Sequence, residues 1–277
     1  MKPMVVALGA DEDVSAPEPV RPPLKWAGGK RWQVRHILPY WQSVKGRRLV
    51  EPFAGGLAVT LGLLPERALL NDVNPHLINF YNWLKQGLVV TAPFDPKEPA
   101  YYRARKRFNA LLATGQSDSA EAAGLFYYLN RTGYNGLCRF NRAGDFNVPF
   151  GRHARLNYRY DFTDYKDVFA GWTFSSTHFS DVPLEPTDFV YADPPYDVEF
   201  TNYSKGGFSW DDQLATAEWL SRHPGPVILS NQATKRIKHE YKRLGFTLQE
   251  FKAPRKISCT GDRSPAVEVL AVRNLPL

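Results

Sequence analysis

The chemistry in this sequence is concentrated where a short apolar run meets two consecutive prolines. Residues 189–192 (Phe-Val-Tyr-Ala) have the character of a buried strand, and Asp193-Pro194-Pro195-Tyr196 follows directly. Proline cannot donate a hydrogen bond within a sheet or enter a helix interior, so the strand is predicted to end at Asp193. The Asp193 carboxylate, the Pro194 carbonyl and the Tyr196 ring are then expected at the carboxyl edge of the sheet, where open α/β sheets bind ligands.

These groups suit a flat base that carries an exocyclic amine. A carboxylate and a carbonyl are two acceptors for one amine, and an aromatic ring beside them is a stacking surface. For Asp-Pro-Pro alone, a strand that ends in a proline-rich surface turn is an open alternative. The full Asp-Pro-Pro-Tyr after an apolar run is rarer, and it resembles the catalytic motif of amino-methyltransferases, which methylate adenine or cytosine in nucleic acid.

Size and charge restrict the class of protein. The 277 residues, 43% hydrophobic and 14% aromatic, predict one large domain or a core with an insertion. Residues 1–20 carry one lysine against four acidic residues and lack periodicity, which predicts a flexible acidic tail of net charge −3. The whole chain has a net charge of +7, so the residues after this tail carry a net charge of +10. This favours an anionic partner such as nucleic acid.

Several classes are disfavoured. The two cysteines and six histidines show no spacing typical of a disulfide framework or a metal site, so no metal is expected. No apolar run approaches the roughly 18 residues of a membrane span, and the first residues lack a signal-peptide core. A cytoplasmic, monomeric protein without a membrane partner is the simplest expectation.

Residues 21–85 alternate strands and helices. Residues 24–30 (Leu-Lys-Trp-Ala-Gly-Gly-Lys) indicate a turn that leads into a helix and attracts a carboxylate or phosphate, although an ordinary turn fits equally. Residues 48–59 indicate a strand, a glycine turn and a helix. A second strand ends on Asp72, which is well placed to bind the ribose hydroxyls of an adenosyl group. A generic dinucleotide fold would share this arrangement, so the pattern predicts a nucleoside cofactor without choosing one.

The alternation is lost over residues 86–172. Helices are expected at 101–112 and 120–130, followed by a hairpin whose tip is Ala143-Gly144-Asp145 between two short strands. Residues 131–160 contain six arginines against one acidic residue, interleaved with aromatic residues. Arginine offers a planar fork for phosphate or guanine, and aromatic rings stack on bases. A solvated basic hairpin is the alternative.

Strands and helices return over residues 173–277. The elements expected there are strands at 173–175, 189–192 and 226–231, a helix at 210–221 capped by Ser209, and antiparallel strands at 246–251 and 267–272.

In their order, these motifs resemble the Dam-type, D12-class DNA adenine-N6 methyltransferases, whose target is the adenine of GATC. The resemblance covers nearly everything after residue 21, and its most specific parts are residues 24–30, 51–55, Asp72, 129–152 and 193–196. It implies an α/β fold: a mostly parallel, seven-stranded, Rossmann-like methyltransferase sheet with an inserted, largely helical target-recognition domain that carries a β-hairpin. The domains would be the tail (1–20), the cofactor half (21–85), the recognition domain (86–172) and the catalytic half (173–277).

The resemblance also implies site residues. S-adenosylmethionine would be the cofactor, contacted by Trp26, Lys30, Asp72 and Asp193, with Phe53 lining its pocket. Asp193, Pro194, Pro195 and Tyr196 would form the catalytic motif.

The implied partner is double-stranded DNA. It would be contacted by Lys25, Tyr134, Asn135, Leu137, Arg139, Asn141, Pro149 and Arg152. Among these, Arg139 would read a guanine, Leu137 and Pro149 would meet thymine methyl groups, and Tyr134 and Asn135 would fill the gap left by an extruded adenine.

The sequence departs from the family pattern at His153 and Phe179, where tyrosine is expected, and at Thr132, where an aromatic residue is expected. Three other functions compete. A cytosine-amine DNA methyltransferase or an RNA adenine methyltransferase would share the core, but usually has Ser or Asn before the prolines. A nicotinamide enzyme would need a fuller Gly-x-Gly-x-x-Gly. A catalytically inactive DNA-binding module would not need an intact catalytic motif.

Deletion of residues 1–20 should leave the melting temperature and the methyl-transfer rate unchanged, because nothing in that composition can pack. Thermal unfolding of the full and shortened chains tests this. A loss beyond the few degrees that ~1 kcal/mol produces would show that the segment docks on the folded protein.

Overall fold

The computed structural model describes residues 20–44, 46–91, 94–153, 155–197, 208–253 and 266–275. The predicted acidic tail lies outside the described residues except for Val20, which is half-buried against the hydrophobic core. Val20 therefore contributes to the core. A deletion that leaves this packing unchanged must end at residue 19.

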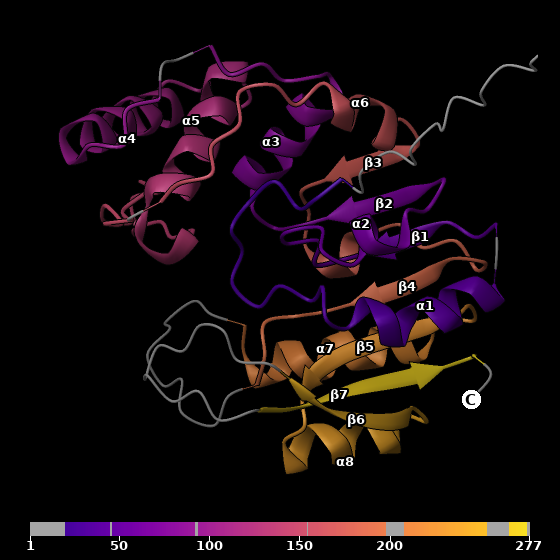
Figure 1. Cartoon of the computed structure of the whole chain (residues 1–277). Helices are drawn as coiled ribbons and strands as arrows, with labels where there is room; N and C mark the ends of the chain where they lie inside the picture. The colour runs from indigo at the N-terminus through magenta and orange to yellow at the C-terminus, as the bar shows by residue number, and fades with distance from the viewer. Residues whose placement is uncertain are drawn as a thin grey trace, which may run out of the picture.

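The α/β class predicted from the sequence is confirmed by a seven-stranded sheet (Figure 1). The strands are β1 (Leu49–Glu51), β2 (Ala68–Asn71), β3 (Trp172–Ser175), β4 (Phe189–Ala192), β5 (Val227–Gln232), β6 (Thr247–Ala253) and β7 (Ala266–Arg273). The helices are α1 (Val34–Ser43), α2 (Thr60–Leu63), α3 (Pro75–Lys85), α4 (Glu98–Ala113), α5 (Ala120–Thr132), α6 (Asp164–Val168), α7 (Trp210–Ser221) and α8 (Lys235–Arg243), with 3₁₀ turns at Tyr134–Gly136 and Phe179–Asp181.

The strand order is β3-β2-β1-β4-β5-β7-β6, and the first five strands are parallel. Strand β7 runs antiparallel to both of its neighbours, as expected for a terminal hairpin. The first residues of β7 therefore lie at the same edge as the last residues of β4 and β5. Glu268, for example, is paired in register with Gln232 at the end of β5.

Both faces of the sheet are covered, which is why its central parallel strands are buried along almost their full length. On one face, Phe189 and Tyr191 of β4 belong to a hydrophobic cluster shared with α1, α2 and α3. On the other face, Val190 and Ala192 pack in a cluster with α7 and α8. All four residues of β4 are buried, so this strand is the rigid support from which the Asp-Pro-Pro-Tyr motif emerges.

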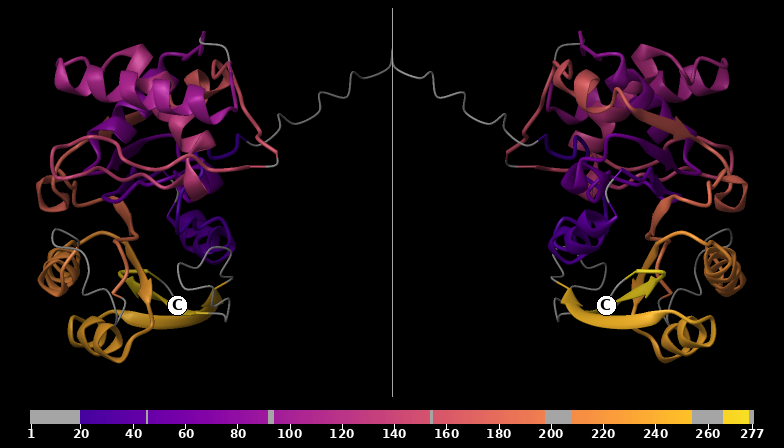
Figure 2. Two further views of the ribbon diagram at one scale, coloured as in Figure 1. Left: turned by 90° about the vertical axis from the view of Figure 1, so that its left-hand side faces the viewer. Right: turned by 90° about the vertical axis from the view of Figure 1, so that its right-hand side faces the viewer.

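Helices α4 and α5 stand at the end of the molecule opposite β6 and α8 (Figure 2). The hairpin after α5 closes through the isolated bridges Gly133↔Phe150 and Phe140↔Phe146. The two short strands predicted around its tip do not form in the described part of the hairpin. Side chains replace the ladder instead: the Asn109 amide bonds to the backbone N–H and C=O of Phe146, at 2.9 and 3.2 Å.

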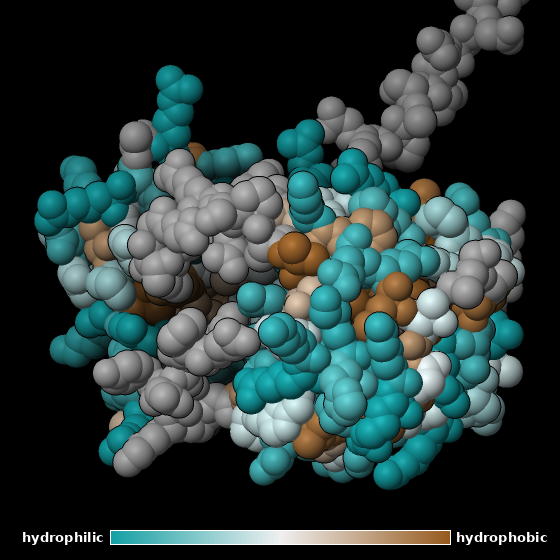
Figure 3. All heavy atoms as spheres, turned by 90° about the horizontal axis from the view of Figure 1, so that it is seen from below, coloured by the Kyte–Doolittle hydropathy of each residue, from teal (hydrophilic) through white to brown (hydrophobic). Residues whose placement is uncertain are grey.

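Helices α6 and α8 were not predicted. Only Ile237 and Tyr241 of α8 are buried, so too few apolar residues recur at helical spacing to predict this helix. The neighbouring edge strand β6 exposes Glu250 and Lys252, charges that disfavour pairing with a further strand. Seen from that end, the surface is mainly hydrophilic, with apolar side chains in small patches (Figure 3). Within the described ranges, no helix is long and apolar enough to cross a membrane, and no group of three or more His, Cys, Asp or Glu side chains is suited to a metal ion.

Candidate active site

Asp193 is the first residue beyond β4 and lies at the carboxyl edge of the sheet, as the sequence predicts. Its side chain is 19% exposed, and the Lys30 ammonium lies 3.5 Å from Oδ1. Burial raises the pKa of Asp193 to about 6; Lys30 opposes this rise and Glu268 adds to it. The 3.5 Å separation is long for a hydrogen bond. Oδ1 is buried without a hydrogen-bond partner among the described residues, so its lone pairs are not used by the protein groups around it.

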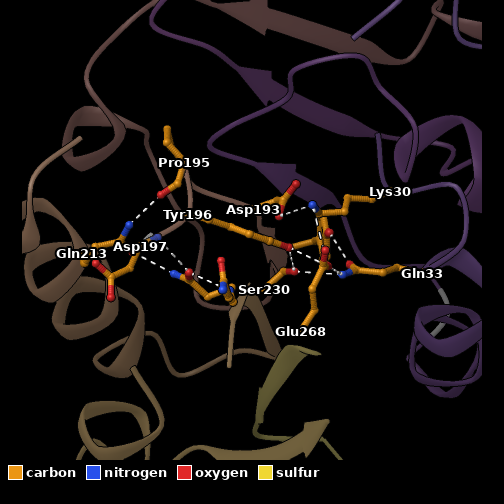
Figure 4. A network of polar contacts seen from close by, with 12 residues as sticks. Lys30, Gln33, Asp193, Pro195, Tyr196, Asp197, Gln213, Ser230 and Glu268 are labelled. Atoms are coloured by element: carbon orange, nitrogen blue, oxygen red, sulfur yellow. Dashed lines mark hydrogen bonds and ion pairs between the residues drawn. The ribbon is translucent and has the colours of Figure 1, made fainter. Parts of the chain in front are cut away.

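The Lys30 ammonium points toward Asp193, Tyr196 and Glu268 (Figure 4). The glycine turn before α1 places it there, and its side chain is buried. Besides Asp193, its ammonium lies 3.8 Å from Glu268 Oε2 and 4.2 Å from the centroid of the Tyr196 ring. The anionic groups that this turn attracts in the structure are therefore two carboxylates of the chain itself.

The rest of the motif is held on both sides. The Tyr196 hydroxyl lies 2.8 Å from Glu268 Oε2 and 2.9 Å from Ser230 Oγ. The Pro195 carbonyl accepts a hydrogen bond of 2.6 Å from Gln213 Nε2 on α7. Pro194 is buried between these anchors. The backbone and ring of the motif are thus fixed before any ligand binds.

Three residues of this site, Gln33, Ser230 and Glu268, were missed in the sequence. Gln33 and Ser230 are fully buried, and Glu268 is 9% exposed. The sequence did contain a signal for Glu268. Alternate residues of a strand share one face of the sheet, and Leu270 and Val272, two and four residues after Glu268, are both core residues. A carboxylate on the apolar face of a strand indicates a buried polar partner.

The predicted cofactor residues gather at the ends of β1 and β2. Asp72 accepts hydrogen bonds from the backbone N–H groups of Gly55 and Asn74, each at 3.0 Å, and burial raises its pKa. Trp26 packs on the glycine turn: a Cβ on Gly55 would lie 2.8 Å from its indole nitrogen. The close approach that these glycines permit is therefore made by Trp26.

Phe53 lies beside Asp72's strand and forms part of an aromatic group. Its ring centroid is 5.6 Å from that of Phe179 and 5.6 Å from that of Phe208. Phe53 and Phe208 are half-buried, whereas Phe179 is buried. The three rings together offer flat apolar surface near Asp72.

The residues predicted to contact DNA lie on the hairpin and its base. Lys25 and Leu137 are half-buried there; the exposed ones are Tyr134, Asn135, Arg139, Asn141, Pro149 and Arg152. The side chain of Asn130 joins this region to the turn before α1, because it accepts from the Lys25 N–H at 2.9 Å and donates to the Lys25 carbonyl at 2.8 Å. The Lys25 ammonium donates to the Arg131 carbonyl at 3.1 Å, and burial followed by the charge of Arg131 lowers its pKa.

The hairpin tip is built by its own polar side chains. Asn141 Oδ1 accepts from the backbone N–H groups of Ala143 and Asp145, both at 2.9 Å, so this side chain shapes the turn. Arg139 donates from Nε to Asn147 Oδ1 at 2.8 Å, which holds its guanidinium on the exposed side. Asn135 has φ of 53°, a left-handed conformation that asparagine tolerates better than most residues.

Glu51, the last residue of β1, lies beside the site and is buried. The Thr60 hydroxyl donates to its carboxyl group. Burial raises the pKa of Glu51 to about 8, and the nearby charge of Asp193 adds to the rise. At neutral pH Glu51 is therefore protonated, so Asp193 has a neutral neighbour on β1.

Comparison with known proteins gives a consistent result. A family model described as D12 class N6 adenine-specific DNA methyltransferase matches residues 26–257. The chain is 37% identical over 268 residues to the Retron Ec67 DNA adenine methylase of Escherichia coli, with 90% of each chain covered. It is 38% identical over 271 residues to the DNA adenine methylase of Vibrio cholerae, covering 90% of this chain and 94% of that protein. The DNA adenine methylase of Escherichia coli K12 is 35% identical over 271 residues, at 89% and 92% coverage.

Glu51→Gln should make folding stability less dependent on pH. The raised pKa means that only the folded state holds the proton between the ordinary value of 4.5 and about 8. Stability is then lost as pH rises through this window, by at most about 1.4 kcal/mol per pH unit. Melting temperatures from pH 5 to 8 should fall less steeply for the variant than for the parent chain. Glu250→Gln, at an exposed residue of β6, is the control. If melting temperature depended equally on pH in the parent chain and both variants, the raised pKa of Glu51 would be refuted.

Proposed function

Because the chain belongs to the D12 class of N6 adenine-specific DNA methyltransferases, we propose that it transfers the methyl group of S-adenosylmethionine to an adenine in GATC within double-stranded DNA. The observation that carries the proposed roles is the buried Oδ1 of Asp193, an acceptor without a hydrogen-bond partner in the described part of the chain. It lies at the carboxyl edge of the sheet, between a lysine and an aromatic ring.

The residues at the ends of β1 and β2 fit the proposed cofactor. Each oxygen of Asp72 already accepts one backbone N–H and retains a lone pair for a ribose hydroxyl. Phe53 and Phe179 offer apolar surface to an adenine ring, and Trp26 covers the glycine turn beside them. When bound, S-adenosylmethionine supplies a methyl group that its sulfonium sulfur has already activated.

The chain's own contribution to the reaction is acceptance and orientation. The adenine amine is a weak nucleophile, because its lone pair is delocalised into the ring. Asp193 and the Pro194 carbonyl would accept hydrogen bonds from its two N–H groups, which favours tetrahedral geometry at the nitrogen and frees the lone pair. The Lys30 ammonium lies over one face of Tyr196, so the base would stack on the opposite face. Positioning of this kind can supply much of an enzymatic rate.

DNA recognition is proposed for the hairpin. An adenine must leave the duplex to reach Asp193, and flipping costs a few kcal/mol. The exposed Tyr134 and Asn135 would fill the space that the base leaves. Arg139, held in place by Asn147, would read a guanine, and Leu137 and Pro149 would meet thymine methyl groups. Lys25 would add a further contact to the recognition sequence, and Arg152 and Asn141 would bind nearby.

Asp193→Ala should abolish methyl transfer and leave DNA affinity largely intact, because it removes an acceptor needed in the transition state. Transfer of labelled methyl groups to a GATC duplex measures the first, and fluorescence anisotropy measures the second. Asp211→Ala, at an exposed acidic residue of α7, should behave as the parent chain. Turnover of Asp193→Ala above ~10% of the parent would refute the catalytic assignment.

Arg139→Ala should relax specificity at one base of GATC, because a bidentate arginine–guanine contact discriminates by ~1–3 kcal/mol. Rates on GATC and its single-base variants should lose roughly one to two decades of preference at that base alone. Arg155→Ala, at another exposed arginine, should slow all sites alike and reduce the salt dependence. Arg159 is unsuitable for this comparison, because it is paired with Asp164 at 2.6 Å. An equal loss at every site would make Arg139 a backbone contact.

A further inference from the structure

Three buried side chains and the half-buried Tyr196 form a closed ring of hydrogen bonds behind the catalytic motif (Figure 4). Gln33 Nε2 donates to Ser230 Oγ at 3.0 Å and to Glu268 Oε2 at 2.8 Å. Tyr196 closes the ring, with its hydroxyl at 2.9 Å from Ser230 and 2.8 Å from Glu268. The four come from the residue before α1, from the catalytic motif, and from β5 and β7.

The charge of Glu268 sets the direction of these hydrogen bonds. A carboxylate only accepts, so the Tyr196 hydroxyl must direct its proton to Glu268. Ser230 then donates to the Tyr196 oxygen and accepts from Gln33. The Gln33 carbonyl accepts from the Tyr191 hydroxyl at 2.8 Å, which fixes the amide orientation. Each of the four polar groups is satisfied, and the Tyr196 ring is held at its far end.

Glu268 also shares the Lys30 ammonium with Asp193, at 3.8 and 3.5 Å. We infer that Glu268 is a positioning residue for methyl transfer: its carboxylate fixes the Tyr196 hydroxyl and the Lys30 ammonium, and through them the stacking ring and the charge beside Asp193. This inference rests on the proposed role of Asp193 and goes beyond it, because Glu268 acts through Tyr196 and Lys30.

The groups that face Asp193 explain why Glu268 matters for its ionisation. They are Lys30, Glu51, Tyr191, Tyr196, Tyr241 and Glu268. Burial raises the pKa of all three tyrosines and that of Glu51, so these four are neutral near pH 7. Among the described residues that act on Asp193, this leaves Lys30 and Glu268, whose charges act in opposite directions on its pKa.

Glu268→Gln removes the negative charge of the side chain but keeps its volume and one hydrogen-bond acceptor, so it tests the charge rather than the shape. At pH 8 Asp193 is ionised in parent and variant, so a change in kcat there reports orientation. We expect kcat to fall roughly 10- to 100-fold, the size typical of a hydrogen bond to a charged group, with KM for a GATC duplex unchanged. A kcat equal to that of the parent at pH 8 would overturn the inference.

The pH profile tests the charge. Loss of the negative charge of Glu268 lets Asp193 ionise at lower pH, so the acid limb of kcat/KM should move to lower pH. Carboxyl ¹³C resonances of the chain alone, with Asp193 assigned from its loss in Asp193→Asn, should show the same decrease in its pKa. An unshifted pKa would overturn the inference. This titration needs no cofactor or DNA, so it stands even if methyl transfer proved independent of Asp193, which would refute only the proposed function.

Two further variants make the test specific. Ser230→Ala removes one hydrogen bond to Tyr196 without changing any charge, so kcat at pH 8 should fall roughly fivefold while the pKa of Asp193 is unchanged. Glu250→Gln, whose carboxylate forms a surface pair with Lys238 at 3.0 Å, should change neither quantity. If circular dichroism shows that Glu268→Gln does not fold, Ser230→Ala tests the inference instead. A kcat for Ser230→Ala equal to that of the parent chain would overturn the positioning role of the hydrogen-bonded ring.

Discussion

One buried ammonium compensates two buried carboxylates, and the geometry of the site depends on this sharing. Lys30 lies 3.5 Å from Asp193 and 3.8 Å from Glu268, and all three side chains are largely enclosed. Buried charges are tolerated only when they are paired and hydrogen-bonded. Glu268 meets this requirement through Gln33 and Tyr196, whereas Asp193 keeps an unbonded oxygen.

The reversed strand β7 is what allows this arrangement. In a wholly parallel sheet only the last residues of each strand reach the ligand-binding edge. Because β7 runs antiparallel between β5 and β6, it brings an early residue, Glu268, to that edge. The strand most unlike the rest of the sheet thus supplies the carboxylate that joins the turn before α1 to the Asp-Pro-Pro-Tyr motif. Topology and chemistry are linked at this one position.

Local patterns were sufficient for most of the fold. Apolar runs located β4 and β5, and Ser209 marked the start of α7, where it forms a capping box with Asp212. They were insufficient for the hairpin, whose turn is held by side chains, and for α8, which buries only two residues. The Gln33 contacts with Ser230 and Glu268 join residues 197 and 235 positions apart, so no periodicity could indicate them. Asp193 was found because the prolines that end its strand are adjacent in sequence.

The two hydrogen bonds between the Asn130 side chain and the Lys25 backbone connect the hairpin to the turn before α1. The Asn130 amide binds both backbone groups of Lys25, so the start of the glycine turn before α1 is held against the base of the hairpin. Lys30 lies five residues further along the same turn. The ammonium beside Asp193 and the base of the hairpin are therefore held in one framework. Loss of the Asn130 amide would loosen the turn that positions Lys30, although Asn130 makes no contact with Lys30 itself among the hydrogen bonds described.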